Sequence, residues 1–241
     1  MRRVSENELR GVLRAAMRGS ALPYGDYENA AEQVLWALMH DCVSWEQLDE
    51  VLDRLQSSSM KLLPPRDQGR IELKGGTLAL YGVQLGDFCM SRALQNGGHT
   101  CLISDARDAE FLGLKLDEGM TLGLFGCLLW SDGDEVKSLY TEALNKKPQY
   151  CVWRKKSEDL SYVVLAFSDS AQHMARLFSH HWSRPTEFAR TVVSPDDMTE
   201  RYHQNIDDGL SVPPESWQRL QQMAASLLVP NTDQSRLGAG A

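Results

Sequence analysis

The stretch QSSSMKLLPPRDQG, residues 56–69, separates two parts of the chain that differ in the type and spacing of their apolar residues. Its serines, prolines and glycine interrupt every helical or strand period, as at a domain boundary. Before it, apolar residues recur every three or four positions, which is typical of amphipathic helices. After it come short runs rich in β-branched and aromatic residues, which favour strands. The sequence therefore predicts an N-terminal helical module, residues 1–60, and a central α+β domain, residues 70–190.

Three helices are expected within residues 4–55. Ser5 and Glu8 have capping-box spacing before the first helix, and Ser44 and Gln47 repeat that spacing before the third. The second helix is expected at about residues 26–39. Each helix has one apolar stripe, so the module needs the rest of the chain, or a second copy, to cover it.

The central domain is expected to combine strands and helices around a mainly antiparallel sheet. RIELKGGTLALYGV, which starts at residue 70, predicts two strands around a Gly-Gly turn, and GVQLG, residues 82–86, predicts a further turn. QLGDFCMSRALQNGG predicts a helix that ends near Gly97. Further strands are expected in HTCLIS, MTLGLFGCLLW, QYCVWRKK and LSYVVLAFS, and helices in KSLYTEALN and SAQHMARLFSHHW. The charged turn KKSED predicts a hairpin between the last two strands.

Residues 191–241 are expected to form C-terminal helices and a Gly/Ala tail that packs back on the core. Ser194 and Pro195, followed by two aspartates, form a helix start with a cap, a proline and first-turn acids. Pro213-Pro214 opens a second helix, and Pro230 closes it.

Composition and charge exclude several classes of partner. The net charge is −8, and the acidic excess lies in residues 1–60 and 191–241, while residues 61–190 are balanced. Because no segment has the clustered positive charge that a phosphate backbone needs, nucleic acid is not an expected partner. The longest apolar run, residues 120–130, is too short to cross a bilayer, so no membrane partner is expected. Five scattered cysteines without a CxxC pair indicate reduced thiols, and we expect a soluble, cytoplasmic protein.

Familiar catalytic and cofactor motifs are missing from the sequence. There is no GxGxxG, GxxxxGK[ST] or GxSxG pattern, so no usual nucleotide cradle or esterase elbow is indicated, and no cofactor is assigned. His173, His180 and His181 fit a helix and its end better than a zinc site. Asp132, with Asp134 and Glu135, fits a polar turn and helix cap better than a calcium loop. No metal site is predicted.

The tail VPNTDQSRLGAGA, residues 229–241, supplies the candidate ligand-binding residues. Arginine is a planar donor that pairs with carboxylates, small hydroxyl and carboxyl groups can assist it, and glycines let a ligand approach the backbone closely. The candidate set is Thr232, Asp233, Ser235, Arg236, Gly238 and Gly240. Because the tail is poor in hydrophobic residues, another surface must hold it if it is ordered.

VSENELRGVLRAAMRGSALPYGDYENAAEQVLWAL, residues 4–38, and the tail resemble the two ends of a group of bacterial proteins, the family called domain of unknown function 3726. The residues that carry the resemblance are Leu22-Pro23-Tyr24-Gly25 and the segment from Val229 to Gly240. The family name implies no reaction. The resemblance does imply that the tail has a role.

The N-terminal helices are also similar to the opening of the malate/L-lactate dehydrogenase family that lacks a Rossmann fold. That resemblance implies a Ser-His-Gly motif, with a catalytic histidine, soon after the second helix. This chain has HDCVSWEQL there, so Trp45 follows Ser44, and His40 lies outside the motif. Because the proton carrier is missing, the dehydrogenase activity is not carried over.

Two functions remain open from the sequence. In the first, the protein binds or transforms a small anionic metabolite, such as an amino acid or an oxo acid, and Arg236 pairs with its carboxylate. In the second, it is a non-catalytic interaction partner or a subunit of a homo-oligomer, and the tail inserts into a neighbouring protomer.

Overall fold

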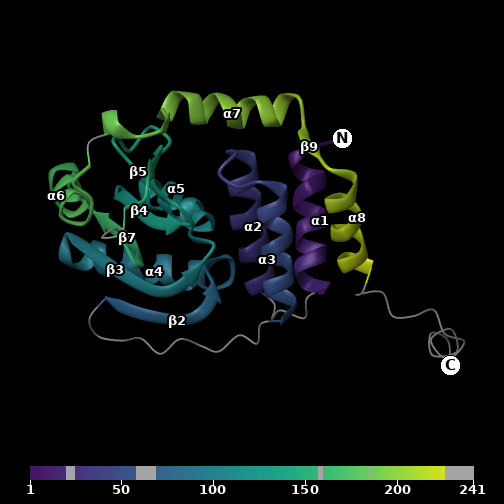
Figure 1. Ribbon diagram of the computed structural model, residues 1–241, viewed down its shortest axis with the longest axis horizontal. Coiled ribbons are helices and arrows are strands. Elements are labelled where there is room, and N and C mark those ends of the chain that lie inside the picture. The colour runs from purple at the N-terminus through teal and green to yellow at the C-terminus, as the bar shows by residue number, and fades with distance from the viewer. Residues whose placement is uncertain (20–24, 58–68, 157–159, 185, 226–241) are drawn as a thin grey trace, which may run out of the picture.

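The computed structural model describes residues 1–19, 25–57, 69–156, 160–184 and 186–225. Within them, a helical bundle lies beside a mixed sheet, and one long helix runs across the top of both (Figure 1). The predicted fold class, α+β with a mainly antiparallel sheet, is confirmed. None of the helices in the described ranges is long and apolar enough to cross a membrane.

The bundle contains the three helices expected near the N-terminus and one from the C-terminal part. These helices are α1 (Glu6–Gly19), α2 (Asp26–Met39), α3 (Trp45–Ser57) and α8 (Pro214–Ala225). Helix α8 packs against α1, and strand β9 (Leu210–Val212) pairs antiparallel with β1 (Arg2–Val4). Segments near both ends of the described chain, β1 with α1 and β9 with α8, therefore share one structural unit (Figure 1).

The larger sheet has seven strands in the order β2-β3-β7-β4-β5-β6-β8. Only β2 and β3 are parallel, and the other neighbours are antiparallel. The strands are β2 (Arg70–Thr77), β3 (Gly98–Arg107), β4 (Phe125–Asp132), β5 (Glu135–Tyr140), β6 (Gln149–Arg154), β7 (Tyr162–Ser168) and β8 (Thr191–Val193).

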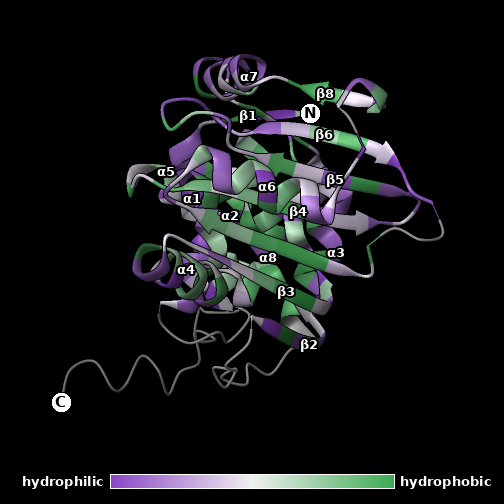
Figure 2. Ribbon diagram, turned by 90° about the vertical axis from the view of Figure 1, so that its left-hand side faces the viewer, coloured by the Kyte–Doolittle hydropathy of each residue, from purple (hydrophilic) through white to green (hydrophobic). Residues whose placement is uncertain are grey.

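Helices cover both faces of this sheet. Helices α4 (Leu78–Asn96) and α5 (Gly113–Thr121), joined through β3 and the short 3₁₀ helix η1 (Ala109–Leu112), lie on the face toward the bundle. Helix α6 (Ala171–His181) covers the other face. Successive residues of β7 point to opposite faces of the sheet. Leu165 therefore belongs to the apolar cluster on the α4 side, and Val164 belongs to the cluster on the α6 side. Hydrophobic residues follow the strands of this sheet in Figure 2.

The chain returns from the sheet to the bundle through η2 (Thr186–Phe188), β8 and α7 (Pro195–Asp207). Ser194 and Asp197 form the capping box of α7, so the helix start predicted at Ser194 is confirmed. Figure 2 shows α7 as largely hydrophilic, as expected for a helix at the surface.

The second strand expected after the Gly-Gly turn is wrong, because helix α4 begins at Leu78. The Thr77 hydroxyl caps this helix by accepting a hydrogen bond from the Ala79 backbone N–H. The turn expected at residues 82–86 is wrong for the same reason. Gly82 and Gly86 lie inside α4, where an added Cβ at Gly86 would come within 2.5 Å of Lys115 Cγ. The apolar character of this segment reflects a buried helix.

Two further predictions in the central domain are wrong. Strands β6 and β7 do not form a hairpin, because β4 and β5 lie between them in the sheet. KSLYTEALN is not a helix, because its first residues form β5, which pairs with both β4 and β6. The turn of the actual hairpin β4–β5 is at Gly133.

Candidate functional site

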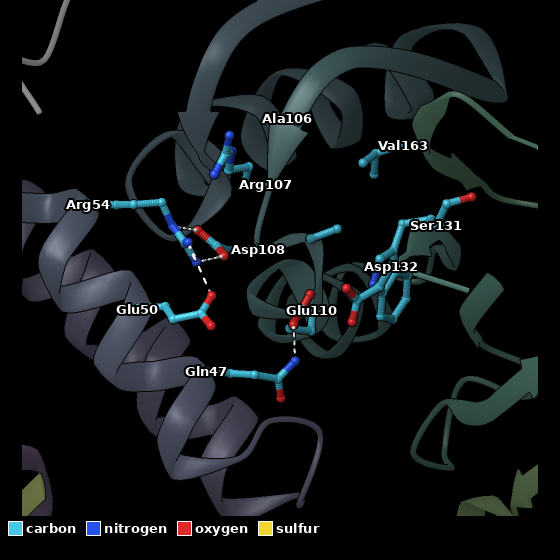
Figure 3. A pocket seen from close by; sticks show the side chains of 13 residues that line it. Gln47, Glu50, Arg54, Ala106, Arg107, Asp108, Glu110, Ser131, Asp132 and Val163 are labelled. Atoms are coloured by element: carbon cyan, nitrogen blue, oxygen red, sulfur yellow. Dashed lines mark hydrogen bonds and ion pairs between the residues drawn. The ribbon is translucent and has the colours of Figure 1, made fainter. Parts of the chain in front are cut away.

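A cavity of about 260 Å³ lies where the helical bundle meets the sheet (Figure 3). Helix α3 supplies one wall, the end of β3 and the start of η1 supply the second, and the end of β4 supplies the third. The volume suits a small metabolite rather than a drug-sized ligand. Figure 3 shows Gln47, Glu110 and Asp132 at one end of the cavity, and Arg54 with two carboxylates at the other.

Asp108 holds Arg54 in place at this second end. Its backbone is left-handed, with φ of 62°, a conformation that aspartate tolerates better than most residues. Its carboxylate accepts hydrogen bonds from Arg54 Nε at 3.1 Å, from a second Arg54 nitrogen and from the Thr77 hydroxyl. Glu50 also pairs with Arg54, at 3.4 Å. The charge of Arg54 is therefore compensated within the protein.

Glu110 is the most unusual group in the cavity, because only 6% of its surface is exposed. Gln47 Nε2 donates a hydrogen bond to Glu110 Oε1 at 3.2 Å. Gln47 is fixed by the capping box of α3, in which its Oε1 accepts from the Ser44 backbone N–H. Burial raises the pKa of Glu110 to about 7, with smaller contributions from the nearby carboxylates of Asp108 and Asp132. Glu110 therefore exchanges its proton near neutral pH.

Two hydrogen-bond donors of the cavity have no acceptor among the described residues, and one of them, Arg107, is exposed to solvent. The indole N–H of Trp130 is buried, and no polar atom in the described part of the chain accepts from it. Arg107, at the end of β3, has no carboxylate partner among the residues that the structure describes. The Asp132 carboxylate, by contrast, is paired with Lys137 Nζ at 2.5 Å. The acceptors are thus largely satisfied, while an indole N–H, a guanidinium and a protonated Glu110 can donate.

The candidate residues of the tail, residues 232–240, lie outside the described residues, so their proposed role stays a prediction. Of the three acidic residues considered for calcium, Asp132 lines the cavity and Glu135 pairs with Arg190 at 3.6 Å. They belong to the β4–β5 hairpin and cap no helix, so the helix-cap part of that prediction is wrong.

The histidines near the end of α6 lie away from this cavity. His180 and His181 occupy the last turn of α6, as predicted, and His173 Nδ1 lies 3.3 Å from the Ser168 hydroxyl. In the described residues no group of three or more His, Cys, Asp or Glu side chains could hold a metal ion. The five cysteines are free and buried, as expected for core thiols.

Sequence reasoning missed Glu110, Trp130 and Arg107. In the sequence, Glu110 follows Asp105, Arg107 and Asp108, and such a charged run is typical of a solvated segment. Burial of Glu110 depends on α3, which precedes it by more than 50 residues. The residue of the site that the sequence did indicate is Gln47, but it was identified by its capping-box spacing from Ser44 and not as a partner of Glu110.

Trp45 stands where the Ser-His-Gly motif of the malate/L-lactate dehydrogenases would place histidine. Its indole N–H donates to the Ser211 carbonyl oxygen at 3.0 Å. The side chain therefore joins α3 to β9 and supplies no proton carrier.

The model of the family described as "Protein of unknown function (DUF3726)" matches residues 4–99. This match, over less than half of the chain, confirms the resemblance predicted from the N-terminal stretch. The matched segment runs from β1 through α4 and the start of β3. No curated protein is similar enough to the chain to count as a match.

Solved structures share the fold over nearly the whole chain at very low sequence identity. A malate dehydrogenase from Pyrococcus horikoshii OT3 is 10% identical with a TM-score of 0.64, and the alignment covers 100% of this chain and 97% of that one. A dehydrogenase from Sinorhizobium meliloti is 12% identical with a TM-score of 0.66, covering 93% and 99%. The delta1-piperideine-2-carboxylate reductase from Pseudomonas syringae pvar. tomato is 10% identical with a TM-score of 0.61, covering 92% and 100%. These similarities show the fold.

Proposed function

We propose that the protein binds a small anionic metabolite, an amino acid or an oxo acid, in the cavity between α3 and the sheet. The Trp130 indole and the Arg107 guanidinium donate to the ligand carboxylate. Protonated Glu110 donates to a second oxygen or nitrogen of the ligand. The observation that carries this proposal is Glu110, a buried carboxyl with a pKa of about 7, in a cavity also lined by Trp130, whose indole N–H has no acceptor among the described residues.

The charges at the cavity balance when Glu110 is protonated. Of the four carboxyl groups that line the cavity, Glu50, Asp108 and Asp132 are paired with Arg54 or Lys137. Glu110, the fourth, becomes neutral when it is protonated. Arg54, Lys137 and Arg107 then balance the other three carboxylates, so an incoming carboxylate meets hydrogen-bond donors in a cavity without net negative charge.

The names of the similar structures support the same ligand class. Malate and piperideine-2-carboxylate both carry a carboxylate, and these are the compounds for which two of those proteins are named. A proton-exchanging group near neutral pH is also what general acid–base chemistry requires. We propose that Glu110 passes its proton to a ligand atom if the bound metabolite is transformed.

A thermal-shift screen with amino acids and oxo acids, including alanine and pyruvate, tests the proposal. A ligand should raise the Tm of the wild type by several degrees at saturation and raise it less in Trp130→Phe, which removes the donor but keeps an aromatic ring. Because the ligand favours protonated Glu110, its Kd should rise up to about tenfold per pH unit above pH 7. In Glu110→Gln this pH dependence should disappear.

Glu46→Gln is the matched control, because Glu46 is an exposed residue of α3 that does not line the cavity. This variant should bind as the wild type does. Equal ligand affinities in the wild type, Glu110→Gln and Trp130→Phe at all pH values would contradict the proposed site.

A second function, that of a non-catalytic partner or homo-oligomer subunit, is favoured by Trp45. This residue occupies the histidine position of the dehydrogenase motif, and its indole bonds to β9. Under this function Arg236→Ala should change the mass of the assembly in sedimentation. If instead the protein has the first function and the tail lies at the ligand site, the same variant should abolish ligand-induced stabilisation and leave the mass of the assembly unchanged.

The five buried free thiols support a cytoplasmic location.

A further inference from the structure

A second cavity, of about 190 Å³, lies where α1, α2, α5 and α7 meet. Its walls include the aromatic rings of Trp36, His40 and Tyr202. Its charged residues are Glu6, Arg10, Glu32, Asp117 and Lys147. The cavity shares no lining residue with the site described above.

His40 presents a buried acceptor that nothing in the described ranges satisfies. The side chain is 1% exposed, and its ring lies between those of Trp36 and Tyr202, with centroid distances of 4.3 and 4.9 Å. Nδ1 lies 2.7 Å from the Trp36 carbonyl oxygen, which can only accept, so Nδ1 carries the proton. Nε2 of the neutral ring is therefore a lone-pair acceptor, and no group in the described part of the chain donates to it.

Asp117 presents a second unsatisfied acceptor in the same cavity. Its Oδ2 accepts from Trp36 Nε1 at 2.7 Å and from Lys147 Nζ. Its Oδ1 is buried, and no donor of the described chain reaches it. Buried polar atoms of this kind are uncommon in folded proteins and are usually satisfied by some partner.

The donors and cations of the cavity are already engaged. Arg10 pairs with Glu6 at 2.5 Å and with Glu32 at 3.1 Å, and Lys147 pairs with Asp117. Glu32 also pairs with Arg14 at 2.9 Å, so three cations match the three carboxylates. His40 adds no charge at neutral pH, because burial, with a smaller contribution from Lys147, lowers its pKa to about 4. The charges around the cavity therefore balance, whereas two of its acceptors, His40 Nε2 and Asp117 Oδ1, have no donor among the described residues.

We propose that this second cavity binds a small organic ammonium ion, whose N–H groups donate to His40 Nε2 and Asp117 Oδ1. The two acceptors match the several N–H donors of a primary ammonium group, and its hydrogen bond to the Asp117 carboxylate is charge-assisted. The volume limits the ligand to a few heavy atoms beyond the nitrogen. This site is independent of the anion site proposed above.

Thermal shift with methylammonium chloride tests the proposal, with tetramethylammonium chloride and potassium chloride at equal ionic strength as references. Methylammonium should raise the Tm by about 3 °C at ten times its Kd, and the rise should saturate. Tetramethylammonium has the charge without N–H donors, and potassium has neither carbon nor N–H, so both should leave the Tm unchanged. An equal response to all three cations, or none to methylammonium, would overturn the proposal.

Variants assign the response to the cavity. His40→Phe keeps a stacked ring but removes Nε2, and Asp117→Asn removes the charge; each should weaken methylammonium binding at least tenfold. His180→Phe changes an exposed histidine of α6 and should bind as the wild type does. Glu110→Gln should also leave this binding unchanged, which separates the two sites. Unaltered affinity in a folded His40→Phe variant would refute the assignment.

A readout on the wild type keeps the test decisive if both variants fail to fold. In protein labelled with ¹⁵N-histidine, the Nε2 resonance of His40 should move on titration with methylammonium and stay in place with tetramethylammonium. A His40 Nε2 resonance that does not respond to saturating methylammonium would overturn the proposal.

Discussion

Glu110 and His40 show how burial acts on single ionisable residues. Burial disfavours the charged form of either group, so it raises the pKa of the Glu110 carboxyl to about 7 and lowers the pKa of the His40 imidazole to about 4. Both side chains are thus neutral over part of the physiological range. Each lines a cavity between the helical bundle and neighbouring elements. At the residue scale, these two shifts make stability depend on pH in opposite directions.

For His40, stability should be lost as the pH falls. The unfolded histidine takes up a proton near pH 6.5, whereas the folded one does so only near pH 4, so the unfolded state binds more protons between these values. Relative to His40→Phe, the wild type should lose about 2–3 kcal/mol of unfolding free energy between pH 7 and pH 4.5. Urea denaturation of both proteins measures this difference, and a difference that does not vary with pH would contradict it.

At the scale of elements, helix starts could be predicted, and the pairing of strands could not. Ser44 with Gln47 forms the expected capping box, and the expected helix start at Ser194 is a capping box with Asp197, because such signals act over a few residues. The expected β6–β7 hairpin failed, since β4 and β5 separate these strands and pairing depends on the whole sheet. Likewise, polar and apolar residues alternate too little between Thr77 and Gly86 for the sequence to distinguish a buried helix from a strand.

The contact between α2 and α5 depends on a missing side chain. An added Cβ at Gly113 would collide with the Trp36 ring, whereas a Cβ at Gly11 of α1 would meet no atom within 4 Å. Gly113→Ala should therefore destabilise the protein by about 1–3 kcal/mol. Gly11→Ala should stabilise it by up to about 1 kcal/mol, because alanine favours a helix. Urea denaturation compares the two, and equal unfolding free energies would show that this packing has been misjudged.

At the scale of the whole molecule, both cavities form where the helical bundle meets the rest of the chain. β1 pairs with β9, α8 packs on α1, and α7 connects the sheet to the bundle, so residues distant in sequence line each cavity. The sequence could predict the helical N-terminal region and a mainly antiparallel sheet. It could not predict either site, because the burial of Glu110 and His40 follows from contacts between elements.

The measurement that tests the central claim most directly is a pH titration of the Glu110 carboxyl carbon by ¹³C NMR, with Glu110→Gln used to assign the resonance. The free protein should show half-titration near pH 7. Saturation with the oxo or amino acid that raises the Tm most should move this midpoint to higher pH, because the anion binds the protonated form. A midpoint near the ordinary glutamate value of 4.5, or one that the bound acid leaves unchanged, would contradict the account.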